Sequence, residues 1–165
     1  MYDYLIEGAQ IIDGTGAAAF AADIGIEKGK IATINPSTQG RTSTAQVGAR
    51  RVIDGSGLVA TPGFVDLHSH TDLRYFEDDP PEAKVRQGVT TELLAQDGLG
   101  VAPVEVKDVE LLSELTAGLL GRLPVERWTW RSFEEYLQAL ERRGLPNNAA
   151  VLASHGPARI KALGM

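Results

Sequence analysis

Residues 58–72 of this 165-residue chain read LVATPGFVDLHSHTD, and this stretch decides the fold. Positions 58–67 are apolar with little alternation, a pattern typical of a strand that is buried on both faces in a parallel sheet. The Pro62-Gly63 pair would interrupt such a strand, because proline cannot donate to the hydrogen-bond ladder. We therefore predict that the strand itself begins at Phe64.

Two histidines follow where the apolar run ends. In an extended chain, side chains two positions apart face the same side, so His68 and His70 should point together. Neutral imidazole is a common protein ligand for zinc-like metals, and the pair could share one ion. Asp66 and Asp72 flank the pair and could orient the rings or add oxygen ligands. The alternative is a chance pairing of two histidines on a polar loop.

Downstream of this stretch, strands and helices alternate. Apolar, β-branched runs predict strands at 89–96 and 148–154, and helical patterns predict helices at 80–87, 106–120 and 132–143. A capping box, SFEE at 132–135, opens the last of these helices. This order is typical of βα units around a parallel sheet, so the predicted fold class is α/β.

The first 57 residues have a different character, with short strands separated by turns. Alternating runs predict strands at 2–7, 23–27, 31–34 and 51–54. The second and third runs surround a glycine-containing turn and form a predicted β-hairpin. Turn-forming and small polar residues at 35–47 predict a surface loop. We therefore divide the chain into residues 1–57 and residues 58–165.

Composition excludes several classes of protein. The chain has 16 Lys and Arg against 22 Asp and Glu, and a net charge of -6 argues against binding to a nucleic-acid backbone. It has no cysteine, and therefore neither a disulfide nor a thiolate zinc site. No apolar run approaches the ~20 residues of a membrane span, and the N-terminus lacks the basic residues of a signal peptide. We expect a soluble cytoplasmic protein that binds neither nucleic acid nor membrane.

Several motifs resemble those of a known family. The stretch ATPGFVDLHSH at 60–70 closely resembles the first barrel strand of the amidohydrolase superfamily. The N-terminal motifs DGTG at 13–16 and VID at 52–54 resemble that family's small β-sandwich. The D-aminoacylase branch, which comprises the N-acyl-D-amino-acid deacylases, has segments similar to QGVTT at 87–91, SFEEYL at 132–137 and SHGPAR at 154–159.

The resemblance implies a two-part architecture. Residues 1–57 would form part of the small β-sandwich, and residues 58–165 would form about the first three units of a TIM-type (β/α)8 barrel. A closed barrel typically takes ~250 residues. We therefore expect the chain to be the N-terminal portion of a longer enzyme, a truncated product or one piece of a split protein, with the missing C-terminal portion or a complementary chain as its partner.

The resemblance also implies a metal site. His68 and His70 would bind the more buried ion of a centre with one or two divalent metals, with zinc as the expected metal. Family members direct a metal-activated hydroxide at an amide carbonyl, and the catalytic aspartate is expected beyond residue 165. The branch has a bridging cysteine where this chain has Asp97. A carboxylate can also ligate or bridge metals, so Asp97 is a candidate ligand, and the alternative is an Asx-turn before Gly98.

Asp72 and His155 complete the candidate site. Asp72 could bind substrate or support a metal ligand, and His155 lies at the end of the strand predicted at 148–154. His155 could contact substrate or a carboxylate behind the metal ligands. It could equally cap the following helix or form a hydrogen bond in the core.

The reaction that the resemblance implies is hydrolysis of the amide bond of N-acyl-D-amino acids, with a small molecule as substrate. One alternative keeps the metal and changes the substrate, as in a cyclic amidase similar to dihydroorotase or hydantoinase. That enzyme would bridge its metals with a lysine from a later strand. The other alternative is a catalytically inactive chain that acts as the partner of a complementary chain.

Overall fold

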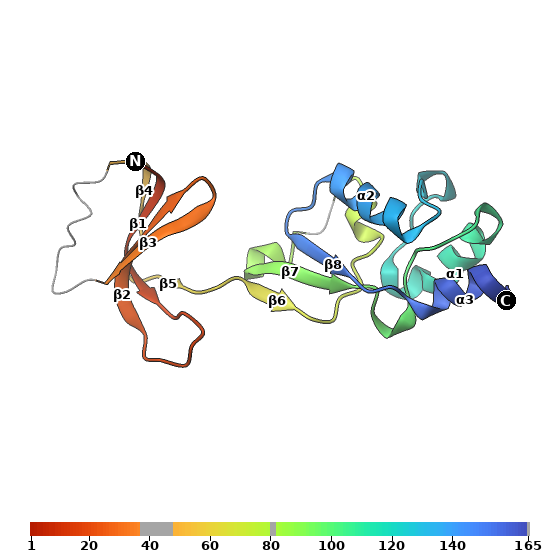
Figure 1. Ribbon diagram of the computed structural model, residues 1–165, viewed down its shortest axis with the longest axis horizontal. Helices are drawn as coiled ribbons and strands as arrows, with labels where there is room; N and C mark the ends of the chain where they lie inside the picture. Colours follow the sequence, from red (N-terminus) through yellow and green to blue (C-terminus); the bar gives the residue numbers. More distant parts are fainter. Residues whose placement is uncertain (37–47, 80–81, 165) are drawn as a thin grey trace. The chain divides into compact units, whose positions relative to one another are not determined.

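A computed structural model covers the chain and describes residues 1–36, 48–79 and 82–164. The chain divides into two compact units, Met1–Pro62 and Gly63–Met165. Both strands and helices are present, which confirms the predicted α/β class (Figure 1). Most of the loop predicted at 35–47 lies outside the described residues.

The first unit is a five-stranded sheet in the order β3-β2-β1-β4, with β5 also paired to β1. The strands are β1 (Tyr2–Ile11), β2 (Phe20–Glu27), β3 (Lys30–Pro36), β4 (Ala49–Asp54) and β5 (Val59–Ala60). The predicted hairpin is confirmed as the antiparallel pair β2–β3. Lys28 and Gly29 form its turn with positive φ angles of 52° and 72°, which match the twist of the flanking strands.

The second unit contains a three-stranded parallel sheet in the order β6-β7-β8 (Figure 1). Its strands are β6 (Phe64–Asp66), β7 (Val89–Leu94) and β8 (Asn148–Val151), and its helices are α1 (Val109–Leu120), α2 (Phe133–Arg143) and α3 (His155–Leu163). Short 3-10 turns occur at Arg74–Phe76 (η2), Val85–Gln87 (η3), Gln96–Gly98 (η4), Val106–Asp108 (η5) and Val125–Arg127 (η6). The parallel strands place the end of β6 beside the end of β7.

Two boundaries in this unit confirm the sequence prediction. Strand β6 begins at Phe64, as expected from the Pro62-Gly63 pair before it. The capping box of α2 is present: Ser132 Oγ accepts the Glu135 N–H at 3.1 Å, and the Glu135 carboxylate accepts the Ser132 N–H at 3.0 Å. Each contact satisfies an N–H group at the helix start that has no partner within the helix.

Other boundaries differ from the prediction. The helix predicted at 80–87 is wrong in extent, because its described part forms only the 3-10 turn Val85–Gln87 before Gly88 adopts a φ of 87°. The strand predicted to reach residue 96 ends at Leu94, because Ala95 adopts a left-handed φ of 63°. The strand predicted at 148–154 ends at Val151, and His155 instead begins α3. The helix predicted from 106 begins at Val109, after one 3-10 turn.

An aromatic cluster forms the centre of the core in the second unit. Trp130 is fully buried, and its ring lies 4.9 Å from Phe76 and 5.1 Å from Tyr136 between ring centres. Its indole N–H donates to the Val101 carbonyl at 2.7 Å, so its polar atom has a partner. The cluster continues to Leu94 on β7 and thereby joins the helical layer to the sheet. Among the residues described, no helix is both long and apolar enough to cross a bilayer.

A buried carboxylate lies on β7 in the second unit. Glu92 pairs with Asp66 of β6 in the parallel ladder and is 2% exposed. Burial alone would disfavour its charge. Hydrogen bonds from Lys84, Ser69, Asn147 and Thr71 outweigh this cost and lower the pKa of Glu92 to about 2. Glu92 is therefore ionised at neutral pH inside the fold.

We expect Trp130→Ala to lower the free energy of unfolding by about 3–5 kcal/mol, because it removes a fully buried ring and leaves a cavity. Urea unfolding followed by circular dichroism would measure the change. Leu137→Ala on α2 is the matched control, because Leu137 is exposed, and it should change stability by less than about 0.5 kcal/mol. Equal losses in the two variants would contradict this account of the core.

Glu92 should also make stability depend on acid pH. Because its pKa falls from 4.5 to about 2 on folding, its charge stabilises the fold above pH 4.5, and this contribution is lost as the pH falls towards 2. We expect the difference in free energy of unfolding between the wild type and Glu92→Gln to shrink by about 3 kcal/mol over that range. Urea titrations of metal-free protein at several pH values would measure it, and a constant difference would refute the assignment.

Candidate metal centre

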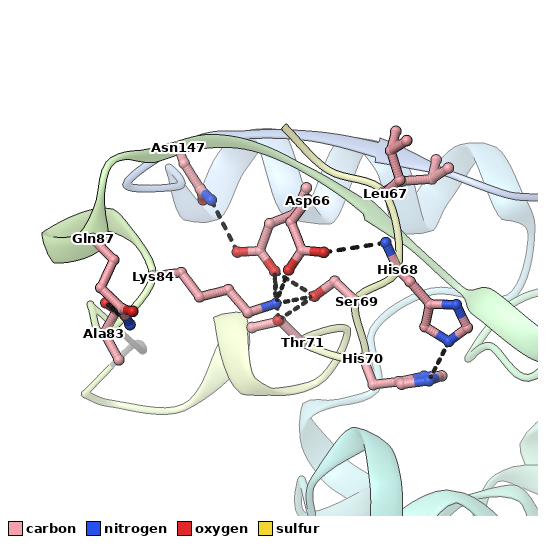
Figure 2. Close-up of polar contacts among 12 residues, drawn as sticks. Asp66, Leu67, His68, Ser69, His70, Thr71, Ala83, Lys84, Gln87 and Asn147 are labelled. Carbon is pink, nitrogen blue, oxygen red and sulfur yellow. Dashed lines mark hydrogen bonds and ion pairs between the residues drawn. The ribbon is translucent and has the colours of Figure 1, made fainter. Parts of the chain in front are cut away.

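The two histidines lie just after β6, on the segment where strand pairing stops. Their Nε2 atoms are 3.2 Å apart, and their rings meet edge to face with centres 5.1 Å apart. Figure 2 shows the two rings turned towards each other. The His68 side chain is 58% exposed and that of His70 is 18% exposed. The structure therefore brings the imidazoles together as their spacing predicts.

Asp97 joins this pair from the end of β7. Its Oδ2 atom lies 3.2 Å from His68 Nε2 and 3.3 Å from His70 Nε2. The chain reaches this position through two left-handed residues, Ala95 at φ 63° and Asp97 at φ 58°. Aspartate tolerates this conformation better than most residues, because its short side chain can form local hydrogen bonds. The bend after β7 thus directs the carboxylate towards the imidazoles.

Hydrogen bonding alone does not account for this cluster. A neutral imidazole carries one N–H, and a carboxylate only accepts. With Asp97 as a carboxylate, at least one of the three contacts therefore sets two donors or two acceptors against each other, whichever ring nitrogens carry protons. A cation shared by the three atoms would remove this conflict, because each atom would then present a lone pair to it.

The spacing of the three atoms fits such an ion. His68, His70 and Asp97 each offer one ligand atom, and these atoms all lie within 4.8 Å of one another. Ligands of tetrahedral zinc at about 2.0–2.1 Å from the ion are separated from each other by about 3.3–3.4 Å. The observed separations of 3.2, 3.2 and 3.3 Å approximate three edges of that tetrahedron.

Asp72 lies two positions after His70 in sequence and is completely buried. Burial raises the pKa of its carboxyl to about 6, although nearby backbone N–H groups partly oppose the shift. Within the described part of the chain, neither of its carboxylate oxygens nor His70 Nδ1 has a hydrogen-bond partner. Each of these three buried atoms is therefore available for a hydrogen bond.

His155 is the first residue of α3 and lies beside the Asp97 turn. A Cβ added to Gly98 would stand 3.9 Å from the His155 Cβ, and a Cβ added to Gly156 would stand 2.8 Å from the Gly98 carbonyl oxygen. The start of α3 therefore packs closely on the turn that carries Asp97. The preceding residue, Ser154, occupies the N-cap position, so His155 is not the capping residue.

The sequence interpretation did not identify the polar residues that surround the histidine segment. These are Ser69, Thr71, Lys84 and Glu92. Glu92 accepts hydrogen bonds from the other three, and Ser69 also contacts Thr71 and Lys84. A signal for Glu92 existed, because a glutamate in the middle of the apolar run VTTELLAQ requires partners once it is buried.

Comparisons with known proteins bear on this site. Residues 51–165 match the amidohydrolase family. N-acyl-D-glutamate deacylase from Alcaligenes xylosoxydans xylosoxydans is 33% identical over 161 residues, which cover 98% of this chain and 30% of that protein. D-aminoacylase from the same organism is 33% identical over 159 residues, with coverage of 96% and 30%. This chain therefore spans about 30% of the length of these curated relatives.

A solved structure gives a similar result. The N-acyl-D-glutamate deacylase from Bordetella bronchiseptica, solved with zinc and a phosphonate inhibitor that mimics the tetrahedral intermediate, superposes with a TM-score of 0.77 at 31% identity. The match covers 98% of this chain and 31% of that one. The family match spans more than half of the chain, and it includes both histidines and Asp97. The chain belongs to the amidohydrolase family.

Proposed function

We propose that this chain supplies part of the active site of a metal-dependent amidohydrolase that cleaves the amide bond of N-acyl-D-amino acids. The observation that carries the proposal is the convergence of one ligand atom each from His68, His70 and Asp97. The named deacylases among its relatives support the substrate class. Because the chain spans about 30% of those relatives, the activity belongs to the whole protein.

His68, His70 and Asp97 would hold the metal, with zinc as the first expectation. Two imidazoles and one carboxylate are a donor set that suits zinc. A divalent ion held there lowers the pKa of a bound water and polarises an amide carbonyl. The chain's own contribution is to fix the three donors at this spacing.

The fold proposal follows from the strand arrangement. We propose that β6, β7 and β8 are the first strands of a TIM-type barrel within residues 58–165, and that residues 1–57 belong to a small β-sandwich. Phe64, Val65 and Leu67, on and just after the edge strand β6, are more than half exposed among the described residues. Such a surface is suited to continued strand pairing and packing.

Other residues of the site would handle substrate. A cavity of about 390 Å³ adjoins His70, Arg74 and Lys84, and this volume lies in the range of small-molecule pockets. Asp72 and His155 would support the ligands or contact substrate, since both lie close to the ligand-bearing segments. The catalytic aspartate that moves the proton to the leaving nitrogen would lie beyond residue 165.

The cyclic-amidase alternative is not favoured. The named relatives that cover nearly the whole chain at 33% identity are deacylases of D-amino-acid derivatives. The inactive-partner alternative predicts that the protein binds no metal through these residues, so metal binding separates it from the proposal.

We expect the purified protein to bind one or two zinc ions per chain, and His68→Ala or Asp97→Asn to weaken the tighter site by more than about 100-fold, since each removes a ligand. Competition with a chromophoric chelator would measure the affinity. Leu137→Ala is the control, because Leu137 is exposed on α2 and lies outside the three-residue cluster. Unchanged zinc affinity in His68→Ala would contradict the metal site.

We expect the full-length protein to hydrolyse N-acetyl-D-amino acids and to discriminate against the L-enantiomers by at least about 100-fold in kcat/KM. A site that binds substrate through several fixed polar groups leaves those groups unpaired with the wrong enantiomer. Release of the free amino acid would be measured for both enantiomers and for a hydantoin. Equal turnover of both enantiomers, or preference for the hydantoin, would refute the substrate assignment.

A further inference from the structure

The residues that alternate with the histidines share a single acceptor. Ser69 and Thr71 both donate to Oε2 of Glu92, with Thr71 Oγ1 at 2.7 Å. Their hydroxyl oxygens lie 2.7 Å apart, and both residues are buried. His70 stands between them in sequence, so the backbone on each side of this histidine is tied to the same carboxylate.

Lys84 extends the contact to the other histidine. Its Nζ atom lies 2.7 Å from Asp66 Oδ2, 2.7 Å from Ser69 Oγ and 2.8 Å from Glu92 Oε2. The free oxygen of Asp66 accepts the backbone N–H of His68 at 3.2 Å. Figure 2 shows the Lys84 side chain reaching the histidine segment beside Asp66 and Ser69. One ammonium group thus connects the residues before and after His68.

Glu92 is itself held from a second direction. The Tyr75 hydroxyl lies 2.8 Å and the Asn147 amide nitrogen 2.9 Å from its other oxygen, Oε1. These residues come from η2 and from the segment before β8. The carboxylate cannot rotate without breaking contacts to several elements, so it is a fixed reference point for the histidine segment.

The histidine segment needs such support. The strand pairing of β6 ends at Asp66, two residues before the first histidine. Beyond it, the Ser69 N–H donates to the Leu93 carbonyl at 3.1 Å, and the Gln96 amide donates to the Leu67 carbonyl at 2.8 Å. After His70, the Thr71 carbonyl accepts the Tyr75 N–H at 3.3 Å, a longer contact that holds Thr71 but neither imidazole.

We propose that Glu92 and Lys84 are positioning residues that hold His68 and His70 in register with Asp97 through Ser69, Thr71 and Asp66. This inference rests on the proposed metal-binding function and adds two residues that do not touch the metal. Groups that orient ligands in this way typically contribute 10–100-fold to metal affinity. A purely structural ion pair would instead affect folding and leave metal affinity unchanged.

The test measures zinc affinity of the full-length, metal-stripped protein by chelator competition, together with the melting temperature of the metal-free form. We expect Glu92→Gln to weaken zinc binding by about 10–100-fold. Leu140→Ala is the control for lost stability, because it opens a cavity in the buried core and removes no hydrogen bond to Glu92 or Lys84. It should lower the melting temperature and leave zinc affinity within about twofold of the wild type.

Thr71→Val provides a milder second variant, because it removes one hydroxyl and preserves the shape of the side chain. If Glu92 acts through Thr71, the loss of zinc affinity in the double variant should be smaller than the product of the two single losses. If both Glu92→Gln and Thr71→Val bind zinc as tightly as the wild type, the positioning role is overturned and the metal site stands. The same conclusion follows if the losses in the two single variants multiply fully in the double variant. Absence of zinc binding by the wild type would overturn the metal site and this inference together.

Discussion

The parallel register between β6 and β7 is the constraint on which the site depends. Asp66 pairs with Glu92, so the segments that follow each strand leave the sheet side by side. His68 and Asp97 are 29 positions apart in sequence, yet their ligand atoms are 3.2 Å apart. A shift of one residue would turn every side chain of β7 to the opposite face. The same register shift would separate Glu92 from Ser69 and would also move Asp97 away from the imidazoles.

The histidine pair was predictable because its spacing of two places both side chains on one side of an extended segment. The chain bends at Leu67 and His68, however, so the tertiary contacts that hold the pair were not predictable from that spacing. The position of Asp97 also needed tertiary information. An aspartate before a glycine is compatible with either an Asx-turn or a metal ligand, so the sequence does not distinguish the two. The left-handed φ angles at Ala95 and Asp97 decide where the carboxylate points. The same bend ends β7 two residues earlier than the apolar pattern predicts.

Glu92 and Lys84 illustrate what periodicity does not reveal. The strand pattern around Glu92 is correct, but its partners lie 8 to 55 positions away in sequence, so no short motif connects them. The helix predicted around Lys84 fails for a related reason. Lys84 is committed to Asp66 and Glu92, and Gly88 turns the chain directly into β7, which leaves room for one 3-10 turn. Apart from this helix, strand and helix identity was therefore predictable here, whereas the polar connections between elements were not.

The carboxylate at position 97 changes the character of the proposed centre. A thiolate is a soft ligand and favours soft ions, whereas a carboxylate is hard and also accepts manganese, magnesium or calcium. Two imidazoles retain a preference for zinc-like metals, so the set His68, His70 and Asp97 is intermediate in softness. With so little selectivity from ligand type, selectivity must come from geometry. The positions of both histidines relative to Asp97 are then decisive, and the buried Glu92 carboxylate, which accepts from five donors, is a rigid means of holding them.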